Sequence, residues 1–139
     1  MLEHDDDDRY ITDVVMRESG YAVDIHFVES SNDLFAFLIT CERMHLPLPS
    51  VILMSYNAMR ADLIETITSL RQNRQYTHIP IVVLGGVVDP SLVSACYTAG
   101  ANSFIRKPSS ASEITGRITS FLHYWFDTVV LPGETTSTP

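Results

Sequence analysis

Basic residues are scarce in this sequence. Of its 139 residues only nine are Lys or Arg, against 17 Asp or Glu, which gives a formal net charge of -8. Direct nucleic-acid binding needs clustered Lys and Arg side chains to neutralise phosphates. Those present are scattered, and Arg106-Lys107 is their one adjacent pair. The composition therefore argues against nucleic acid as a direct partner.

Cysteine and long apolar runs are also in short supply. Cys41 and Cys96 stand alone, with no CxxC or His/Cys spacing, so neither a zinc site nor a disulfide framework is indicated. No apolar run approaches the roughly 20 residues needed to span a bilayer. The N-terminus lacks the basic-then-apolar order of a secretory signal. We expect a cytoplasmic protein with no membrane contact and with two buried free thiols.

What the sequence does contain is short apolar runs between amphipathic segments. Residues 51–55 follow two prolines and read as a strand buried on both faces. Further strands are predicted at residues 21–28, 79–84 and 103–106. Helices are predicted from the aspartate run to Gly20, from Ser30 or Ser31 through Ile39, over Ala61–Asn73, from Asp89 to Gly100, and from about Ser110 towards Val130.

This alternation predicts one α/β domain over residues 1–132, followed by a disordered tail over residues 133–139. In such folds the loops after parallel strands converge and hold the functional site. Here those loops begin near Glu3-His4, Ser55, Gly85 and Lys107. Only Met1 to Glu3 remain for a first strand, which is either very short or completed by residues before Met1.

Three segments carry a family resemblance: residues 51–57, 78–84 and 99–108, in that order and spacing. Together they resemble receiver domains of two-component response regulators. Tyr124-Trp125 with residues 129–132 is similar to the C-terminal extension of the phytochrome-associated, single-domain type. The resemblance implies a flavodoxin-like fold with a five-stranded parallel sheet in the order 2-1-3-4-5. It also implies a bacterial phosphorelay signalling protein that is not an enzyme.

The resemblance assigns the phosphorylation pocket to positions that have changed. Glu3 and His4 stand where the family has an acidic pair, Ser55 stands where it has the phosphoaccepting aspartate, and Asn57 follows in the same loop. Phosphotransfer needs a carboxylate that attacks phosphorus and a Mg²⁺ ion held by anionic oxygens. Ser55 removes the nucleophile and one metal ligand, and His4 removes another. We therefore expect no catalytic residue, no bound metal and loss of Mg²⁺ binding.

The remaining pocket positions are changed in part. Gly85 stands where the family has a Thr or Ser, so it cannot donate a hydroxyl hydrogen bond to a phosphoryl group. Lys107 is kept, and Pro108 follows it with a peptide bond that is commonly cis in the family. Phe104 keeps the aromatic switch position. For Lys107 three roles stay open: a hydrogen bond to a carboxylate or loop carbonyl, an inherited remnant, or a site for a small anion.

These features predict a degenerate receiver, or pseudo-receiver, that signals by protein–protein interaction without aspartyl phosphorylation. The main alternative is a phosphorylatable regulator that uses a displaced carboxylate, Asp5, Asp6 or Asp62. A hydrolase with Ser55 as nucleophile and His4 as base is a weaker hypothesis, because no GxSxG elbow is present. Phosphorylation of Ser55 by a separate kinase is another.

A degenerate receiver would act by binding a protein partner, such as a histidine kinase or photoreceptor kinase, or by forming a homodimer. The resemblance places the partner face at Val93, Tyr97, Phe104, Phe121, Tyr124 and Trp125. Four aromatic residues lie close together at positions 121, 124, 125 and 126. At 100° per residue they cannot all face one side of a helix, so at least one should be exposed. The alternative is that they cover the domain's own core.

Overall fold

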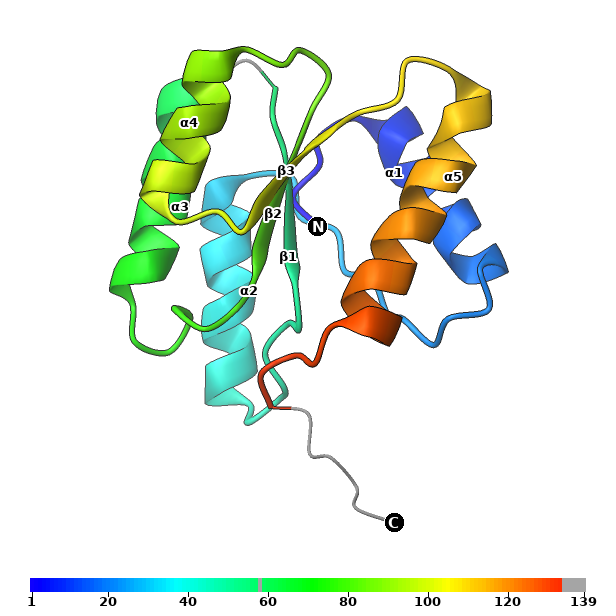
Figure 1. The fold of residues 1–139 in the computed structure, drawn as a ribbon. Helices are drawn as coiled ribbons and strands as arrows, with labels where there is room; N and C mark the ends of the chain where they lie inside the picture. Colours follow the sequence, from blue (N-terminus) through cyan, green and yellow to red (C-terminus); the bar gives the residue numbers. More distant parts are fainter. Residues whose placement is uncertain (58, 134–139) are drawn as a thin grey trace.

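The computed structural model describes residues 1–57 and 59–133 (Figure 1). The predicted disordered tail, residues 133–139, lies outside the described residues except for Gly133. The strands are β1 (Ile52–Ser55), β2 (Ile81–Gly85) and β3 (Ser103–Arg106). The helices are α1 (Asp6–Glu18), α2 (Ser31–Arg43), α3 (Arg60–Gln72), α4 (Pro90–Ala99) and α5 (Ala111–His123), with a π-helical turn, η1 (Tyr124–Thr128), directly after α5.

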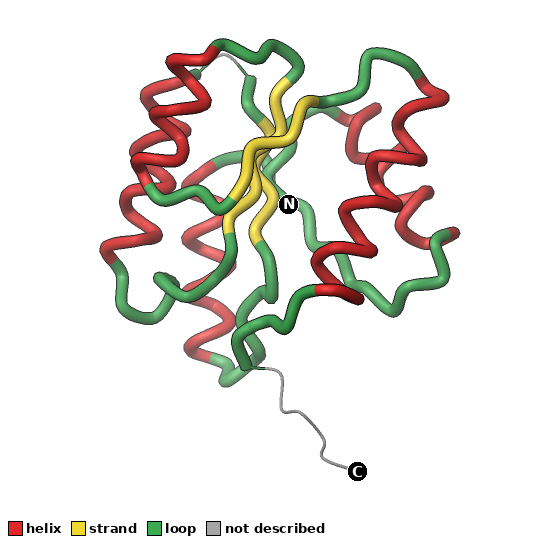
Figure 2. The backbone as a smooth tube through the Cα atoms, viewed as in Figure 1, coloured by secondary structure: helices red, strands yellow, loops and turns green. Residues whose placement is uncertain are grey.

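The strands form a parallel sheet in the order β1-β2-β3, with helices on both faces. Helices α1 and α5 cover one face, and α2, α3 and α4 cover the other (Figures 1 and 2). Alternate strand residues point to opposite faces. Ile52 and Met54 accordingly pack in the core under α2, α3 and α4, whereas Leu53 packs in the core under α1 and α5. The predicted α/β architecture, a parallel sheet with helices on both faces, is confirmed.

The first two predicted strands are reduced to single bridges. Leu2 is bridged in parallel to both Val28 and Met54. Within the described residues neither bridge extends into a ladder of several residues. The prediction of a strand over residues 21–28 was therefore wrong in extent. Residues 1–3 exchange backbone hydrogen bonds with Val28, and the Met1 amino group donates to the His26 carbonyl at 2.6 Å, but within the described residues no ladder continues back from there. The five-strand order stays a prediction.

Helix termini follow the side-chain chemistry of the sequence. The side chains of Asp5, Ser30 and Asp89 accept hydrogen bonds from backbone N–H groups in the first turns of α1, α2 and α4. Helix α4 has proline in its first turn, as predicted, and stops at Gly100, whose φ of 120° suits glycine. Within the described residues no peptide bond is cis, so the cis bond implied for Pro108 is absent.

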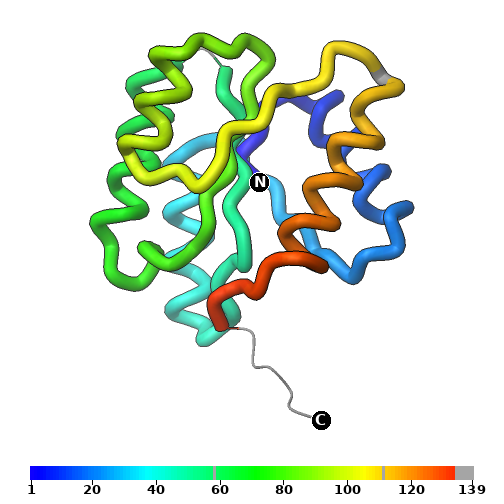
Figure 3. The backbone as a smooth tube through the Cα atoms, in the orientation of Figure 1, coloured from blue at the N-terminus to red at the C-terminus, as the bar shows by residue number. Residues whose placement is uncertain are grey.

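The chain thus folds back on itself so that its two ends share one layer. Figure 3 shows α1, near the N-terminus, beside α5, near the C-terminus.

Both cysteines are free and buried, as expected. In the described part of the chain, no helix has the length and apolar character needed to cross a membrane.

Candidate functional site

Ser55 ends β1 at the carboxyl edge of the sheet. Its residue surface is only 5% exposed, and its hydroxyl has no hydrogen-bond partner of regular geometry among the described residues. Its backbone N–H donates to the Leu2 carbonyl at 2.9 Å, which holds β1 against the first segment of the chain. The position that the resemblance assigned to a phosphoacceptor is therefore a buried, neutral hydroxyl.

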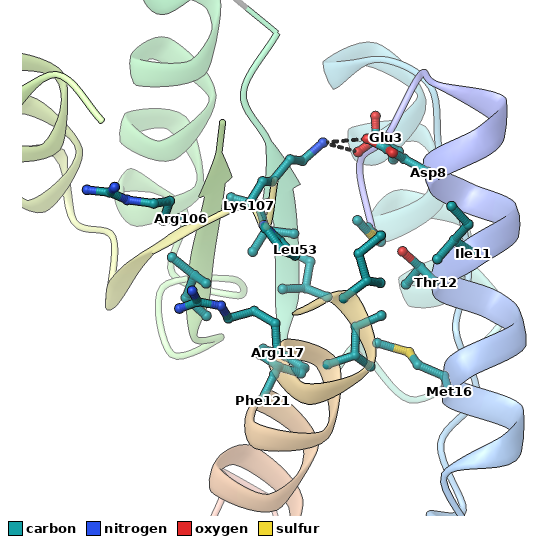
Figure 4. A pocket seen from close by; sticks show the side chains of 16 residues that line it. Glu3, Asp8, Ile11, Thr12, Met16, Leu53, Arg106, Lys107, Arg117 and Phe121 are labelled. Carbon is teal, nitrogen blue, oxygen red and sulfur yellow. Dashed lines mark hydrogen bonds and ion pairs between the residues drawn. The ribbon is translucent and has the colours of Figure 1, made fainter. Parts of the chain in front are cut away.

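Lys107 binds two carboxylates at this edge (Figure 4). Its Nζ donates to Glu3 Oε2 at 3.0 Å and to Asp8 Oδ2 at 2.8 Å. The Glu3 side chain is 1% exposed, the Lys107 side chain 25% and the Asp8 side chain 46%. Of the three roles left open for Lys107, the hydrogen bond to a carboxylate is the one observed.

The cluster favours the ionised forms of Glu3 and Lys107. Burial alone would raise the pKa of Glu3, but the nearby Ser55 hydroxyl, the Asp5 N–H and Lys107 together lower it. Burial alone would lower the pKa of Lys107, but its bonds to Asp8 and Glu3 raise it. Opposite charge and hydrogen bonding thus outweigh desolvation for both groups.

His4 and Asn57 reach this edge without joining the cluster. His4 is exposed, and its Nδ1 lies 3.8 Å from Glu3 Oε1. Asn57 is also exposed, and its side-chain oxygen accepts a hydrogen bond from the Met59 N–H at 3.3 Å. No hydrogen bond joins His4 to Ser55 in the described part of the chain, so the arrangement lacks the nucleophile–base contact of a hydrolase.

Asp8 is the site residue that the sequence did not predict. The alternatives Asp5, Asp6 and Asp62 have other partners: Asp5 caps α1, Asp6 pairs with Arg9, and Asp62 accepts from the Ser31 hydroxyl at 3.2 Å. Asp8 lies one helical turn beyond the Asp5 cap. The sequence carries no separate signal for it, because which aspartate of the run faces the sheet edge depends on the residue at which α1 begins.

Gly85 and Phe104 fit together closely. A Cβ at Gly85 would lie 2.6 Å from Phe104 Cζ and 3.1 Å from Phe104 Cε1. Real Cβ atoms do not come so near to a neighbouring ring. The half-buried Phe104 ring therefore takes up the space that any side chain at position 85 would need.

We expect Gly85→Ala to lower the free energy of unfolding by about 1–2 kcal/mol, because the added methyl group forces the Phe104 ring to move. Urea unfolding of Gly85→Ala, Phe104→Leu and the double variant measures this effect. If the contact is responsible, the two costs combine to less than their sum. Strictly additive costs would show that Phe104 does not oppose a side chain at position 85.

The predicted partner face is only partly on the surface. Tyr97 is 48% exposed, and its hydroxyl accepts the Phe104 N–H at 3.1 Å. Val93 is half-buried, and Tyr124 is 53% exposed. Phe121 and Trp125 are buried and cover the domain's own core under α1 and α5, as the alternative had it. Tyr124 is exposed, as expected for at least one of the four aromatic residues. That these positions form a partner face stays a prediction.

Metal ligands do not gather at this edge. Among residues 1–57 and 59–133, no three His, Cys, Asp or Glu side chains lie where they could share a metal ion. The two Glu3 oxygens accept from Lys107 and from the Asp5 N–H, and position 55 offers a hydroxyl.

The arrangement of the elements defines the class of fold: it is that of response-regulator receiver domains. The crystal structure of the phosphorylated cyanobacterial phytochrome response regulator RcpA matches with a TM-score of 0.83 at 20% identity, over 94% of both chains. A response regulator in red light signaling of R. palustris matches with a TM-score of 0.82 at 22% identity, over 96% of both chains. These likenesses establish the fold.

In sequence, the chain is similar to the response regulator Rcp1 of Synechocystis sp., with 28% identity over 86 residues. That match covers 62% of this chain and 58% of Rcp1, less than two thirds of that relative's length. The Mn²⁺-bound form of Rcp1 is also similar in structure, with a TM-score of 0.80 at 24% identity over 94% of this chain and 95% of that one. No protein-family model matches the chain.

Proposed function

We propose that this chain is a response-regulator receiver domain of the Rcp1/RcpA type that transmits a signal by binding a protein partner, without aspartyl phosphorylation and without enzymatic activity. The observation that carries the proposal is the buried Ser55 hydroxyl at the end of β1, beside a lysine that is bound to Glu3 and Asp8. An unactivated alcohol is a poor nucleophile at neutral pH.

The residues at this edge do not fit Mg²⁺. The ion needs several oxygen ligands, most of them anionic or water, in a near-octahedral shell. Glu3 is the one buried carboxylate here, and Lys107 already binds it. His4 offers a nitrogen and Ser55 a neutral oxygen. We therefore propose that Mg²⁺ binding is lost, and we derive no step that depends on it.

The proposed module retains exposed side chains for binding a partner but lacks the hydroxyl group that would respond to a phosphoryl group. Gly85 has no hydroxyl to follow a phosphoryl group, and the Phe104 ring occupies the adjacent space. Tyr97 and Tyr124 remain exposed for a partner, which in this proposal is a histidine kinase, a photoreceptor kinase or a second copy of the chain. We propose this surface as the site of signal transfer.

One observation supports a second candidate function. Asp8 is a half-exposed carboxylate whose Oδ2 lies 2.8 Å from Lys107 Nζ. A displaced phosphoacceptor would need such a lysine beside it to stabilise the charge of the transferring group. A phosphorylatable regulator with Asp8 as acceptor is therefore the alternative, in place of Asp5, Asp6 or Asp62.

Incubation with acetyl phosphate and Mg²⁺, followed by intact mass spectrometry, separates the two functions. We expect no gain of phosphoryl mass and no change in sedimentation. A hydroxylamine-labile adduct that disappears in Asp8→Asn would establish the displaced acceptor and contradict the pseudo-receiver proposal. A hydroxylamine-stable adduct at Ser55 would contradict it as well, since it would show that the alcohol accepts phosphate. The matched control is Asp13→Asn, on α1 but bound to Arg17.

A further inference from the structure

An apolar cavity of about 110 Å³ lies between α1, α5 and the sheet (Figure 4). Most of its lining is aliphatic or aromatic. The apolar lining side chains include Ile11, Met16, Leu53, Ile105, Ile118 and Phe121. For comparison, an engineered apolar cavity of about 150 Å³ in another protein stays dry and binds benzene. This space therefore suits a group of roughly the size of one small ring or a branched alkyl chain.

Polar groups occur at one end of the cavity. Glu3, Asp8 and Lys107 line it there, with Lys107 bonded to both carboxylates. An ammonium group has three N–H donors, and two of those of Lys107 are used. In Figure 4 the Thr12 hydroxyl points from α1 towards the same space. A bound molecule would thus meet an apolar interior with hydrogen-bond donors and acceptors at one end.

The charges at that end select an uncharged head group. Two carboxylates and one ammonium leave a net charge of -1, which repels an anion. A cation would have to compete with Lys107 for carboxylates that it already binds. Arg106 and Arg117 also line the cavity, but both are exposed, and in Figure 4 their guanidinium groups extend away from α1. Water and salt screen such a charge.

We propose that this cavity binds a small uncharged alcohol with an aromatic ring or branched alkyl group. The apolar part fills the space between Leu53 and Phe121, and the hydroxyl bonds to Thr12 and the Glu3–Asp8–Lys107 cluster. Neither a phosphoryl group nor a protein partner is needed for this binding, so it is independent of the proposed function. Such a ligand would link the α1–α5 layer to the residues at the edge of the sheet.

Benzyl alcohol, benzoate, benzylammonium and toluene test the proposal, because they share one ring and differ in the head group. Titration of each into the ¹⁵N-labelled chain gives its affinity and its position from amide shifts. We expect saturable shifts on α1, α5 and β1 with benzyl alcohol, and binding about tenfold weaker or more for both charged probes. Absence of saturable shifts there, or tighter binding of benzoate or benzylammonium, overturns the proposal.

Two variants connect the binding to this cavity. Ile118→Trp fills the cavity and should abolish the shifts. Ile39 lies on α2 and is 43% exposed, so Ile39→Trp should leave the shifts unchanged. Thr12→Val removes the hydroxyl with little change of shape and needs no repacking. It should weaken benzyl alcohol about threefold to tenfold and leave toluene unaffected. Equal binding of benzyl alcohol to Thr12→Val and the unmodified chain would contradict the assigned orientation.

Discussion

Lys107→Met is expected to lower the free energy of unfolding by about 3 kcal/mol at pH 7. The change removes the cation that neutralises Glu3, whose side chain is 1% exposed, and breaking a buried ion pair on one side typically costs 3–5 kcal/mol. Methionine keeps most of the apolar stem, so lost packing adds little. We choose the lower end because the Lys107 side chain is 25% exposed. Urea unfolding monitored at Trp125 measures the effect.

Neutralising Glu3 as well identifies the cause. The double variant Glu3→Gln/Lys107→Met leaves no unpaired buried charge, so it should be more stable than Lys107→Met alone. Asp8→Asn is the matched single change: Asp8 is 46% exposed, and such pairs contribute about 0–1 kcal/mol. If Asp8→Asn costs as much as Lys107→Met, the buried Glu3 charge is not the reason for the loss.

The contributions of Glu3 and Lys107 to the free energy of unfolding change with pH in defined directions. The pKa of Glu3 is lowered from its ordinary 4.5, so its contribution is present above pH 4.5 and is lost as the pH falls through the folded-state pKa. The pKa of Lys107 is raised from 10.5, so its contribution is present below pH 10.5 and is lost at higher pH. Lys107→Met removes two of the interactions that lower the pKa of Glu3, the hydrogen bond and the opposite charge, so this pKa is higher in the variant than in the unmodified chain. The difference in the free energy of unfolding between Lys107→Met and the unmodified chain should therefore become smaller as the pH falls.

The sequence was sufficient to predict which strand ends meet. Ser55, Gly85 and Lys107 lie at one edge because parallel strands in an α/β sheet all end on the same side, and the apolar runs located those strands. Side-chain caps located the helices for a similar reason. The Ser30 side chain accepts a hydrogen bond from the backbone N–H three residues later, and the Asp89 side chain accepts one from the N–H two residues later. Both contacts depend on local chemistry alone.

Asp8 could not be singled out in the same way. Four aspartates follow one another, and which of them meets Lys107 depends on where α1 begins. A shift of one residue in that start turns the helix face by about 100°. The contact between Phe104 and Gly85 was hidden for another reason, since ring placement depends on the packing of β3 against β2. Residues 21–27 alternate as a strand would, yet within the described residues they form no ladder, and the Met1 amino group reaches them only at the His26 carbonyl.

Ser55→Asp is expected to cost about 3 kcal/mol at pH 7, although it restores the residue type of a phosphoacceptor. Position 55 is 5% exposed, and its side chain lies beside the buried Glu3 carboxylate, whose pKa the Ser55 hydroxyl helps to lower. Two carboxylates in one desolvated site cannot both ionise cheaply, so the pKa of one of them rises. Lys107 would have to be shared among three carboxylates. Urea unfolding between pH 5 and pH 8 measures the cost.

Ser55→Asn separates charge from size, because it adds the same number of heavy atoms without a negative charge. The new carboxyl group binds its proton more tightly in the folded state, so the stability of Ser55→Asp should fall relative to Ser55→Asn as the pH rises. Mg²⁺ should offset this deficit only if Glu3 and the new carboxylate can share the ion. If the difference in the free energy of unfolding between Ser55→Asp and Ser55→Asn does not change with pH, water solvates position 55 and this fold does not need a neutral side chain there. If the difference in stability between Ser55→Asp and Ser55→Asn grows with pH, this edge, with Lys107 already bound to Glu3, tolerates a neutral side chain better than the carboxylate that phosphotransfer needs.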